Sequence, residues 1–299
     1  MNGAECYQDW GILHYWFRAV EKYAPWVRKI HFITCGQIPE WLNLEHPKLH
    51  FVRHEDYIPH QWLPTFSANP IELNMFRISG LSEKFVYFND DTFLNAPVRP
   101  DDFFANGLPR TCAGLHPGPL GLAHPNMPEC AHYDLNNIVT IVKNFDFGAS
   151  FRANWPKWIN PRYSLFVLAK TILLLPYWRF TGFHDWHAPN AFLKSTFIEV
   201  WDKEEKLLER ASSQRFRSFF DVTQLLMKDW QIASGKFYPV NPKIAKSYRR
   251  IGQFKAFVDD IKFHKHKLIC LNDYAFYEKV QEIRALYGEV FPEKSSFEV

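Results

Sequence analysis

The sequence predicts an α/β fold with a mainly parallel sheet and a helix-rich C-terminal half. Two observations support this fold class. Segments with strand-like and helix-like patterns alternate through the first 115 residues, and helical periodicity dominates the residues that follow. Alternation at these spacings is typical of βαβ units, in which helices connect parallel strands.

The first part of the chain begins with a helix, predicted because Trp10, Leu13 and Phe17 recur at helical spacing. Runs rich in aromatic and β-branched residues predict the strands, and the run at 84–88 is continuous enough to indicate a strand buried on both faces. The predicted elements are a helix at 9–24, a strand at 29–35, a short helical turn at 39–42, a strand at 48–54, a helix at 70–78, a strand at 84–88 and a strand near 111–115.

Beyond residue 115, a proline-rich loop at 116–130 precedes a series of helices. We predict helices at 133–144, 162–175, 189–208 and 221–233, then a strand at 267–271 and a closing helix at 276–287. We therefore expect a single domain over 1–299, with a sheet part at 1–115, a helix-rich insertion at 116–265 and a returning strand and helix at 266–299.

The charge balance and the cysteines argue against several classes of protein. The net charge is only +3, from 35 basic and 32 acidic residues, so a nucleic-acid partner is not indicated. The five cysteines form no CxxC pair, which argues against a disulfide framework or a zinc cluster and favours a reducing compartment. Aromatic residues make up 17% of the chain and suit either packed interfaces or sugar-stacking surfaces.

The sequence shows neither a signal peptide nor a segment that would span a bilayer. The residues before Trp10 lack the basic and then apolar run of a secretory signal. The most apolar segment, 165–175, is much shorter than the ~20 residues of a spanning helix. We interpret it as a buried core helix, with a helix at a membrane surface as the alternative because Arg162 and Arg179 flank it. We expect a cytoplasmic protein, with peripheral association at the inner face of the membrane left open and the oligomeric state undetermined.

Two predicted strands end in acidic residues, which are the first candidates for a functional site. Asn89, Asp90 and Asp91 follow the strand at 84–88, and Asn272 and Asp273 follow the strand at 267–271. In a parallel sheet both groups would meet at the edge where ligands bind. Clustered carboxylates there suit a hard cation such as Mg²⁺. The alternatives are a helix cap or a turn for the first group and a helix cap for the second, and the cap is the better interpretation of the second group taken alone.

A histidine-containing loop and an arginine-rich segment supply further candidates. His187 lies in the loop 184–190, where a histidine could act as a general base, although His184 is better interpreted as an ordinary surface residue. No third ligand lies nearby in the sequence, so zinc is disfavoured. Arg217, within 214–221, suits phosphate oxygens, with a solvated basic patch as the alternative. The residues alone indicate a metal-assisted enzyme for a phosphate-containing substrate.

The chain resembles the Stealth family, which comprises bacterial capsular-polysaccharide phosphotransferases and the catalytic part of the animal lysosomal-enzyme GlcNAc-1-phosphotransferase. The resemblance covers most of the chain and rests on Asn89-Asp90-Asp91, His187-Ala188-Pro189, Cys270-Leu271-Asn272-Asp273 and the stretches 20–27, 36–43, 63–67, 71–72, 77–82, 100–104 and 291–298. It implies a nucleotide-sugar-transferase-like core of the Rossmann-like or GT-A-like kind. Members usually begin with a strand and an acidic turn before the first helix, so we expect a member shortened at its N-terminus that lacks this first strand.

The resemblance also implies an activity, which is transfer of a hexose- or N-acetylhexosamine-1-phosphate in capsular or exopolysaccharide synthesis. The donor would be a nucleotide-sugar, taken to be UDP-linked, and the acceptor a polysaccharide hydroxyl. A phosphodiester would form and the nucleoside monophosphate would leave. The implied cofactor is Mg²⁺ or Mn²⁺.

By the same likeness, each candidate residue acquires a role. Asp90 and Asp91 would hold the metal and the diphosphate, with Asp91 essential. His187 would be the base for the acceptor hydroxyl, and Arg217 would clamp the transferred phosphate. The implied substrate-binding residues are Gln37, Glu72, Arg77, Asn89 and Asp273.

Two other functions remain open at this point. A glycosyltransferase that moves the sugar alone would hold its donor with the same acids. A non-catalytic glycan-binding protein would also account for the aromatic content.

Overall fold

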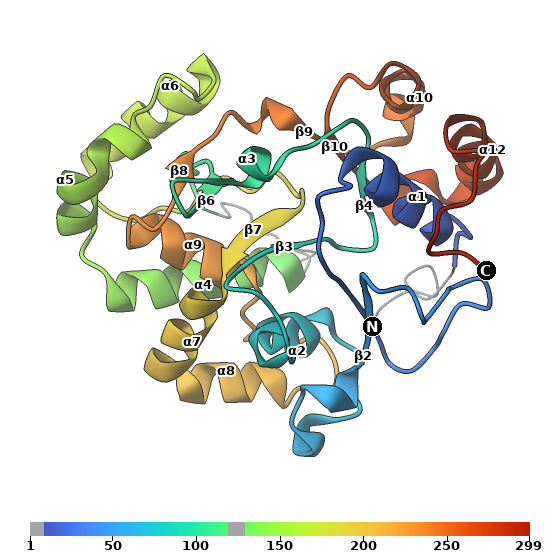
Figure 1. Cartoon of the computed structure of the whole chain (residues 1–299). Helices are drawn as coiled ribbons and strands as arrows, with labels where there is room; N and C mark the ends of the chain where they lie inside the picture. Colours follow the sequence, from blue (N-terminus) through green and yellow to red (C-terminus); the bar gives the residue numbers. More distant parts are fainter. Residues whose placement is uncertain (1–8, 119–128) are drawn as a thin grey trace.

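The computed structural model describes residues 9–118 and 129–299 (Figure 1). Up to residue 118, short strands alternate with short helices, as the sequence predicts. The elements of this part are α1 (Leu13–Tyr23), β1 (Ile30–Thr34), β2 (Leu49–Arg53), α2 (Ala68–Leu73), β3 (Lys84–Tyr87), β4 (Thr92–Leu94), α3 (Pro100–Phe103), β5 (Phe104–Ala105) and β6 (Leu108–Thr111).

Helices dominate beyond residue 128, with strands interspersed between them. The elements of this part are α4 (Glu129–Asn144), α5 (Phe147–Trp158), α6 (Leu165–Leu174), β7 (Asn190–Leu193), α7 (Lys194–Lys203), α8 (Glu205–Ser212), α9 (Leu225–Ala233), β8 (Tyr238–Pro239), β9 (Ala245–Tyr248), α10 (Phe254–Phe263), β10 (Leu268–Leu271), α11 (Asp273–Phe276) and α12 (Val280–Val290). The predicted proline-rich loop falls mostly on residues 119–128, outside the described part of the chain. The sequence did not predict α5, α10 or β9.

The strands pair into small mixed sheets, so the predicted α/β class is confirmed but the predicted mainly parallel sheet is wrong. The parallel pairs are β1 with β2, β6 with β8 and β9 with β10. The antiparallel pairs are β3 with β7, β4 with β10 and β5 with β6. β3 and β4 each take a partner from much later in the chain, and local sequence patterns carry no information about the direction of such a partner.

The residues 190–193 are a strand, whereas the sequence predicts the start of a helix at 189–208. β7 pairs with β3, with Tyr87 opposite Asn190 and Phe85 opposite Phe192. Leu193 and Phe197 are both buried and lie four residues apart, which produced a helix-like spacing across a strand and the helix that follows it. This correction matters for the site because it places the loop before β7 at the end of β3.

Two hydrophobic cores share β3 between them. Val86 and Phe88 pack against the first core, and Phe85 and Tyr87 against the second, as alternation along a strand requires. β3 thus packs on both faces as predicted, although these side chains are half-buried. The first core includes residues of α1, β4, β10 and α12, and the second includes residues of β7, α4, α7 and α9.

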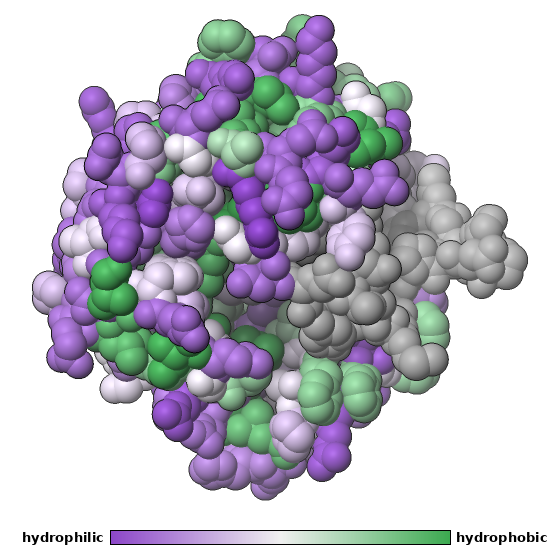
Figure 2. Space-filling model, turned by 90° about the vertical axis from the view of Figure 1, so that its right-hand side faces the viewer, coloured by the Kyte–Doolittle hydropathy of each residue, from purple (hydrophilic) through white to green (hydrophobic). Residues whose placement is uncertain are grey.

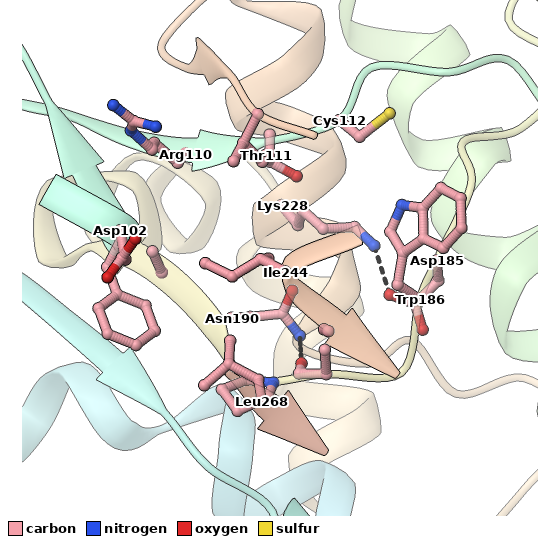
Figure 3. A pocket seen from close by; sticks show the side chains of 16 residues that line it. Asp102, Arg110, Thr111, Cys112, Asp185, Trp186, Asn190, Lys228, Ile244 and Leu268 are labelled. Atoms are coloured by element: carbon pink, nitrogen blue, oxygen red, sulfur yellow. Dashed lines mark hydrogen bonds and ion pairs between the residues drawn. The ribbon is translucent and has the colours of Figure 1, made fainter. Parts of the chain in front are cut away.

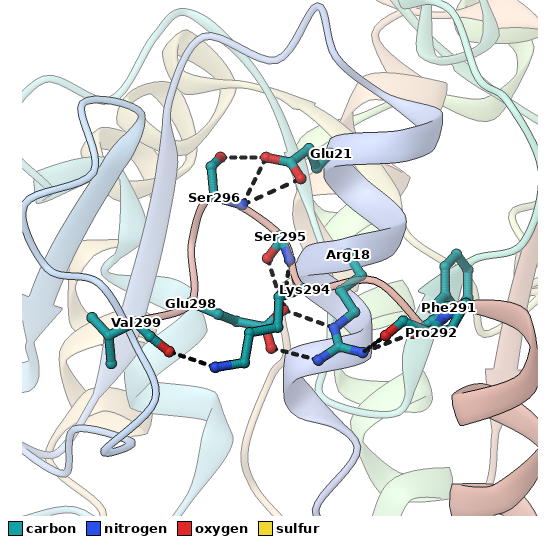
Figure 4. A network of polar contacts seen from close by, with 9 residues as sticks. All are labelled: Arg18, Glu21, Phe291, Pro292, Lys294, Ser295, Ser296, Glu298 and Val299. Carbon is teal, nitrogen blue, oxygen red and sulfur yellow. Dashed lines mark hydrogen bonds and ion pairs between the residues drawn. The ribbon is translucent and has the colours of Figure 1, made fainter.

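The C-terminal segment 291–299 fastens onto α1 (Figure 4). The guanidinium of Arg18 donates to both carboxylate oxygens of Glu298, at 2.7 and 2.6 Å, and to the carbonyl of Phe291 at 2.7 Å. The backbone N–H of Ser296 donates to Glu21 at 3.1 Å. Bidentate pairs of this kind fix orientation as well as contributing energy. The motif at 291–298 therefore helps to close the first core.

Crossing a bilayer requires a long and apolar helix, and the described ranges 9–118 and 129–299 contain none that meets both conditions.

Candidate active site

Asn89, Asp90 and Asp91 form a tight turn between β3 and β4, which is called the acidic turn below. The backbone N–H and the hydroxyl of Thr92 both donate to the carbonyl oxygen of Asn89, at 3.1 and 2.7 Å. The carbonyl of Asp91 accepts from the N–H of Leu271 at 2.8 Å, so β10 runs alongside the turn. The turn that the sequence allowed as an alternative is thus present, and it holds two carboxylates at the end of a strand.

Asp91 is the centre of the candidate site because two side chains from distant parts of the chain meet its carboxylate. His187 Nε2 and Cys270 Sγ each lie 3.1 Å from Asp91 Oδ2. The three ligand atoms all lie within 4.8 Å of one another. Oδ1, the other carboxylate oxygen, is buried and has no hydrogen-bond partner among the described residues. Leaving such an oxygen unpaired is costly, so this atom marks a place for a cation or a hydrogen-bond donor.

The pairing of β7 with β3 brings His187 to Asp91. Asn190 is opposite Tyr87, so the residues before β7 lie beyond the end of β3, next to the acidic turn. His187 adopts a positive φ of 45°, in the left-handed region that few residues other than glycine occupy. A conformation of this kind persists only where the surroundings hold it.

Asp185 and Lys228 hold the loop that carries His187. The backbone N–H of His187 donates to Asp185 Oδ2 at 3.1 Å. Lys228 Nζ, from α9, donates to Asp185 Oδ1 at 2.7 Å, and the Lys228 side chain is only 5% exposed. Burial opposes ionisation of Asp185, but the charge and the hydrogen bond of Lys228 lower its pKa overall. The histidine is therefore positioned by a buried ion pair.

Electrostatics prepare His187 for proton transfer. Its hydrogen bond to Asp91 raises the pKa of His187 above the ordinary value; burial opposes this shift, and the charges of Asp91 and Asp185 add to it. Its side chain is 39% exposed, and within the described ranges the ring nitrogen Nδ1 meets no hydrogen-bond partner. An imidazole with one nitrogen held by a carboxylate and the other open can accept a proton from a bound hydroxyl group.

Glu72 lies close enough to His187 and Asp90 to interact with them electrostatically, and Arg217 lies close enough to Glu72. Glu72 is buried and accepts a hydrogen bond from the hydroxyl of Tyr87 at 2.8 Å. Burial raises the pKa of Glu72 to about 7, while the positive charge of Arg217 lowers it and the negative charge of Asp90 raises it. Arg217 is exposed at the surface. Glu72 therefore borders the site, and Arg217 is placed next to Glu72.

Gln37 and Arg77 make their contacts elsewhere. Gln37 is exposed in the loop after β1, where its side-chain oxygen accepts from the Cys35 thiol at 2.9 Å. The guanidinium of Arg77 lies 4.8 Å from the ring centroids of both Phe76 and Trp201. The structure gives both residues local packing or turn contacts, and their predicted roles in the substrate site stay predictions.

The end of β10 also lies next to the site, but through antiparallel pairing and not through the predicted parallel sheet. β10 is antiparallel to β4, so its carboxyl end meets the beginning of β4 rather than its end. Asn272 caps α11 by accepting from the N–H of Ala275 at 3.3 Å, which confirms the helix-cap interpretation for this residue. The side chain of Asp273 lies outside the described part of the chain.

Three neighbours of the Asp91–His187 pair were not predicted as site residues. Cys270 lies opposite Thr92 in the β4–β10 pair, Asp185 precedes His187 by two residues, and the charge of Arg249 opposes protonation of His187. Asp185 and Cys270 lie within motifs that the sequence already singled out. Arg249 gave no such signal, because only the fold brings it near.

The residues present fit a hard divalent cation. Asp91 Oδ1 lacks a hydrogen-bond partner among the described residues, and Asp90 is the preceding residue in the turn. The surrounding protein, by displacing water, raises the pKa of Asp90, and the neighbouring charge of Asp91 adds to the shift. A cation would relieve that repulsion. His187 and Cys270 offer softer donor atoms, but burial and Asp91 raise the pKa of Cys270 and keep it a thiol, which disfavours a thiolate-bound metal.

A cavity of about 60 Å³ lies beside the loop that carries His187 (Figure 3). Asp185, Lys228 and Arg110 are among its polar lining residues. Arg110 Nε is buried and has no hydrogen-bond partner in the described part of the chain. Pockets that take drug-sized ligands measure roughly 300–1,000 Å³. This cavity is therefore too small for a ligand of that size.

Comparison with known proteins places this chain among enzymes of bacterial polysaccharide synthesis. The family model described as Stealth protein CR2, conserved region 2, matches residues 6–111. A capsular polysaccharide phosphotransferase, WcwK, of Streptococcus pneumoniae is 41% identical over 305 residues, covering 100% of this chain and 88% of the relative. The exopolysaccharide phosphotransferase cps2G of Lactiplantibacillus plantarum is 39% identical over 305 residues, covering 99% and 88%. The receptor polysaccharide phosphotransferase WefC of Streptococcus oralis is 36% identical over 304 residues, covering 100% and 90%.

Proposed function

Because the chain belongs to the Stealth family and is a phosphotransferase of polysaccharide synthesis, we propose that its donor is a UDP-linked sugar and its product a phosphodiester. The transferred group is a hexose- or N-acetylhexosamine-1-phosphate. The acceptor is a hydroxyl group of a glycan, and uridine monophosphate leaves. We also propose that the α/β part is a nucleotide-sugar-transferase-like core, with its acidic turn at the donor diphosphate.

The observation that carries the proposal is the contact between His187 Nε2 and Asp91 Oδ2 at 3.1 Å. A carboxylate that binds one imidazole nitrogen fixes the tautomer that leaves the other nitrogen free to accept a proton. The same carboxylate keeps its second oxygen unpaired for a cation or donor. This arrangement joins a general base to a phosphate-binding centre.

Each residue then has a defined part in the transfer. The acceptor oxygen attacks the phosphorus next to the donor sugar, and its proton passes to Nδ1 of His187. A P–O bond to the acceptor forms, the P–O bond to the bridging oxygen breaks, and the electron pair leaves with the nucleoside monophosphate. Asp91 stabilises the imidazolium that results. Arg217, close to Glu72 at the border of the site, neutralises charge on the transferred phosphoryl group.

Asp91 and Asp90 would hold Mg²⁺ or Mn²⁺, which when bound would supply positive charge against the donor diphosphate.

Product analysis tests the proposed reaction. The purified chain is supplied with UDP-hexoses or UDP-N-acetylhexosamines, Mg²⁺ and a capsule oligosaccharide, and the released nucleotide is identified. We expect uridine monophosphate and an acceptor that has gained a phosphodiester. Release of uridine diphosphate would mean that the sugar alone moves, and would overturn the proposal.

A substitution of the base tests its assignment separately. His187→Asn should lower kcat by roughly 10²- to 10⁴-fold with a smaller change in KM, because no base then takes the proton of the attacking hydroxyl group. His60→Asn, at an exposed position, is the matched control and should leave kcat unchanged. Near-normal turnover by His187→Asn would remove this residue from the mechanism.

A further inference from the structure

The helix α6 exposes an apolar face to solvent. Leu165 is 85% exposed, Phe166 69% and Leu173 74%, and Tyr177, just beyond the helix, is 69% exposed. Residues 165, 166, 169, 172, 173 and 176 follow one another at helical spacing, and all of them are apolar and exposed. A surface helix of a globular protein normally presents polar residues on this side, so the pattern is inverted.

The inverted orientation is fixed by the packing of the opposite side of the helix. Val167 and Thr171 are fully buried, and Val167 packs with Cys112 and Tyr163. The Thr171 hydroxyl accepts from the backbone N–H of Leu115 at 3.1 Å. The helix is anchored by these contacts, so its apolar face points outward in the folded molecule.

The stretch of chain that carries this face is basic and contains no acidic residue. The stretch 147–184, which includes α5 and α6, contains no Asp or Glu and five basic residues, which are Arg152, Lys157, Arg162, Lys170 and Arg179. Arg162 and Arg179 are exposed on either side of the helix along the chain. Two exposed tryptophans, Trp155 and Trp178, lie in the same stretch, at 54% and 49% exposure.

The opposite end of the molecule offers a contrast. α5 and α6 lie at one end of the molecule, far from α12 (Figure 1). Figure 2 shows the end that carries α12, where hydrophilic residues prevail and hydrophobic ones lie scattered between them. The end with α12 therefore does not share the apolar character of the α6 face.

We propose that the exposed face of α6, with Tyr177 and Trp178, docks on the surface of a lipid bilayer that contains anionic lipids. Leucine, phenylalanine and isoleucine side chains suit the acyl boundary, tryptophan and tyrosine suit the headgroup level, and the basic residues complement anionic headgroups. With 10 residues, α6 lies on a bilayer and does not cross it.

Docking there would hold the catalytic loop close to the membrane. Trp186 packs against the Cys112–Tyr163–Val167 cluster that anchors α6, and it immediately precedes His187. The inference rests on the surface of α6 and not on the proposed reaction, so either can fail without the other.

Vesicle binding by the purified full chain tests the proposal. The vesicles are phosphatidylcholine with about one third phosphatidylglycerol, and phosphatidylcholine alone as the comparison. We expect at least about tenfold stronger partitioning onto the anionic vesicles, weakened by added salt and accompanied by a blue shift of tryptophan fluorescence. Equal or absent partitioning onto both vesicles would overturn the proposal.

Variants of the apolar face locate the contact. Phe166→Glu and Leu173→Glu should each lower partitioning by about tenfold or more, since each inserts a charge into the face. Phe263→Glu is the matched control, because Phe263 is also a phenylalanine on a helix with 69% exposure but lies on α10. A second variant, Arg162→Gln with Arg179→Gln, leaves the apolar residues in place and should reduce the preference for anionic lipid.

Two results would overturn the assignment to a bilayer. Phe166→Glu and Leu173→Glu could partition like the unaltered chain while Phe263→Glu does not. Alternatively, sedimentation could show self-association that Phe166→Glu abolishes, with no vesicle binding, and the face would then belong to a second copy of the chain.

Discussion

The two hydrophobic cores hold the two halves of the candidate site in different ways. The first core supplies Asp91 and Cys270 through the paired backbones of β4 and β10. The second core supplies His187 through side chains, since Asp185 and the buried Lys228 of α9 hold its loop. The carboxylate is thus positioned by main-chain hydrogen bonds, which a substitution hardly alters. The pairing of β7 with β3 brings the histidine to the site, but its loop is held by one ion pair, which a single substitution can remove.

The largest effect is expected at the point where the two regions meet. Asp91→Asn keeps the shape of the side chain but cannot stabilise the His187 imidazolium or bind a cation as a carboxylate does. We expect kcat to fall by at least about a thousandfold with little change in the free energy of unfolding. Steady-state kinetics and chemical denaturation measure the two quantities. Asp101→Asn, on the exposed first turn of α3, is the control and should retain full activity.

Removing the ion pair of the second region should affect both stability and activity. Lys228→Met leaves the carboxylate of Asp185 largely buried without its cation, which should lower the free energy of unfolding by about 3 kcal/mol. It should also lower kcat, because the loop no longer fixes His187.

Lys236→Met gives the matched comparison for this prediction. Lys236 pairs with Glu199 at 2.6 Å, but the lysine side chain is 44% exposed. The expected loss is less than about 1 kcal/mol, with kcat unchanged. Equal losses in the two variants would show that burial of the Asp185–Lys228 pair does not hold the loop.

Around the first core, the free energy of unfolding should depend on pH through Glu298. Burial opposes its ionisation, but hydrogen bonds from Arg18 and Ser295 lower the pKa of Glu298 to about 2 from 4.5. Because the folded-state pKa is depressed, this stabilisation is complete above pH 4.5 and is lost as the pH falls toward 2. It amounts to at most about 3 kcal/mol.

Glu298→Gln should therefore flatten the pH dependence of unfolding in this interval while His187 and its loop remain in place. Denaturant unfolding at a series of pH values measures it. Glu55→Gln is the control, because both side chains of the Arg53–Glu55 pair are exposed and the pair should contribute little to stability. An unchanged pH profile for Glu298→Gln would mean that the C-terminal segment does not contribute through this pair.

The sequence predicted what local patterns determine. Helical spacing located α1, α4, α9 and α12, and the apolar run before Asn89 located β3. The same patterns misassigned residues 190–193, because the helical spacing of Leu193 and Phe197 spans the end of a strand and the helix that follows it. They also gave no direction for the partners of β3 and β4, which come from the second half of the chain.

The site was predicted in part for the same reason. Asp91 and His187 were identified from their motifs, and the structure brings them together. α6 was interpreted as a core helix because its composition is apolar, and only the packing of Val167 and Thr171 shows which face is buried. Cys270 was not assigned to the site, because its place beside Asp91 follows from the antiparallel pairing of β4 with β10.

Cys270 gives the smallest expected effect and the sharpest test of how the carboxylate is held. Its thiol donates to Asp91 Oδ2 at 3.1 Å, and a serine hydroxyl can replace that donor. If main-chain pairing positions Asp91, Cys270→Ser should change kcat by less than about threefold, and Cys270→Ala should lower it only modestly by removing one donor. Cys35→Ser, at an exposed cysteine, is the control. A loss in Cys270→Ala as large as that in Asp91→Asn would instead make the thiol essential for positioning the carboxylate, and the backbone would not suffice.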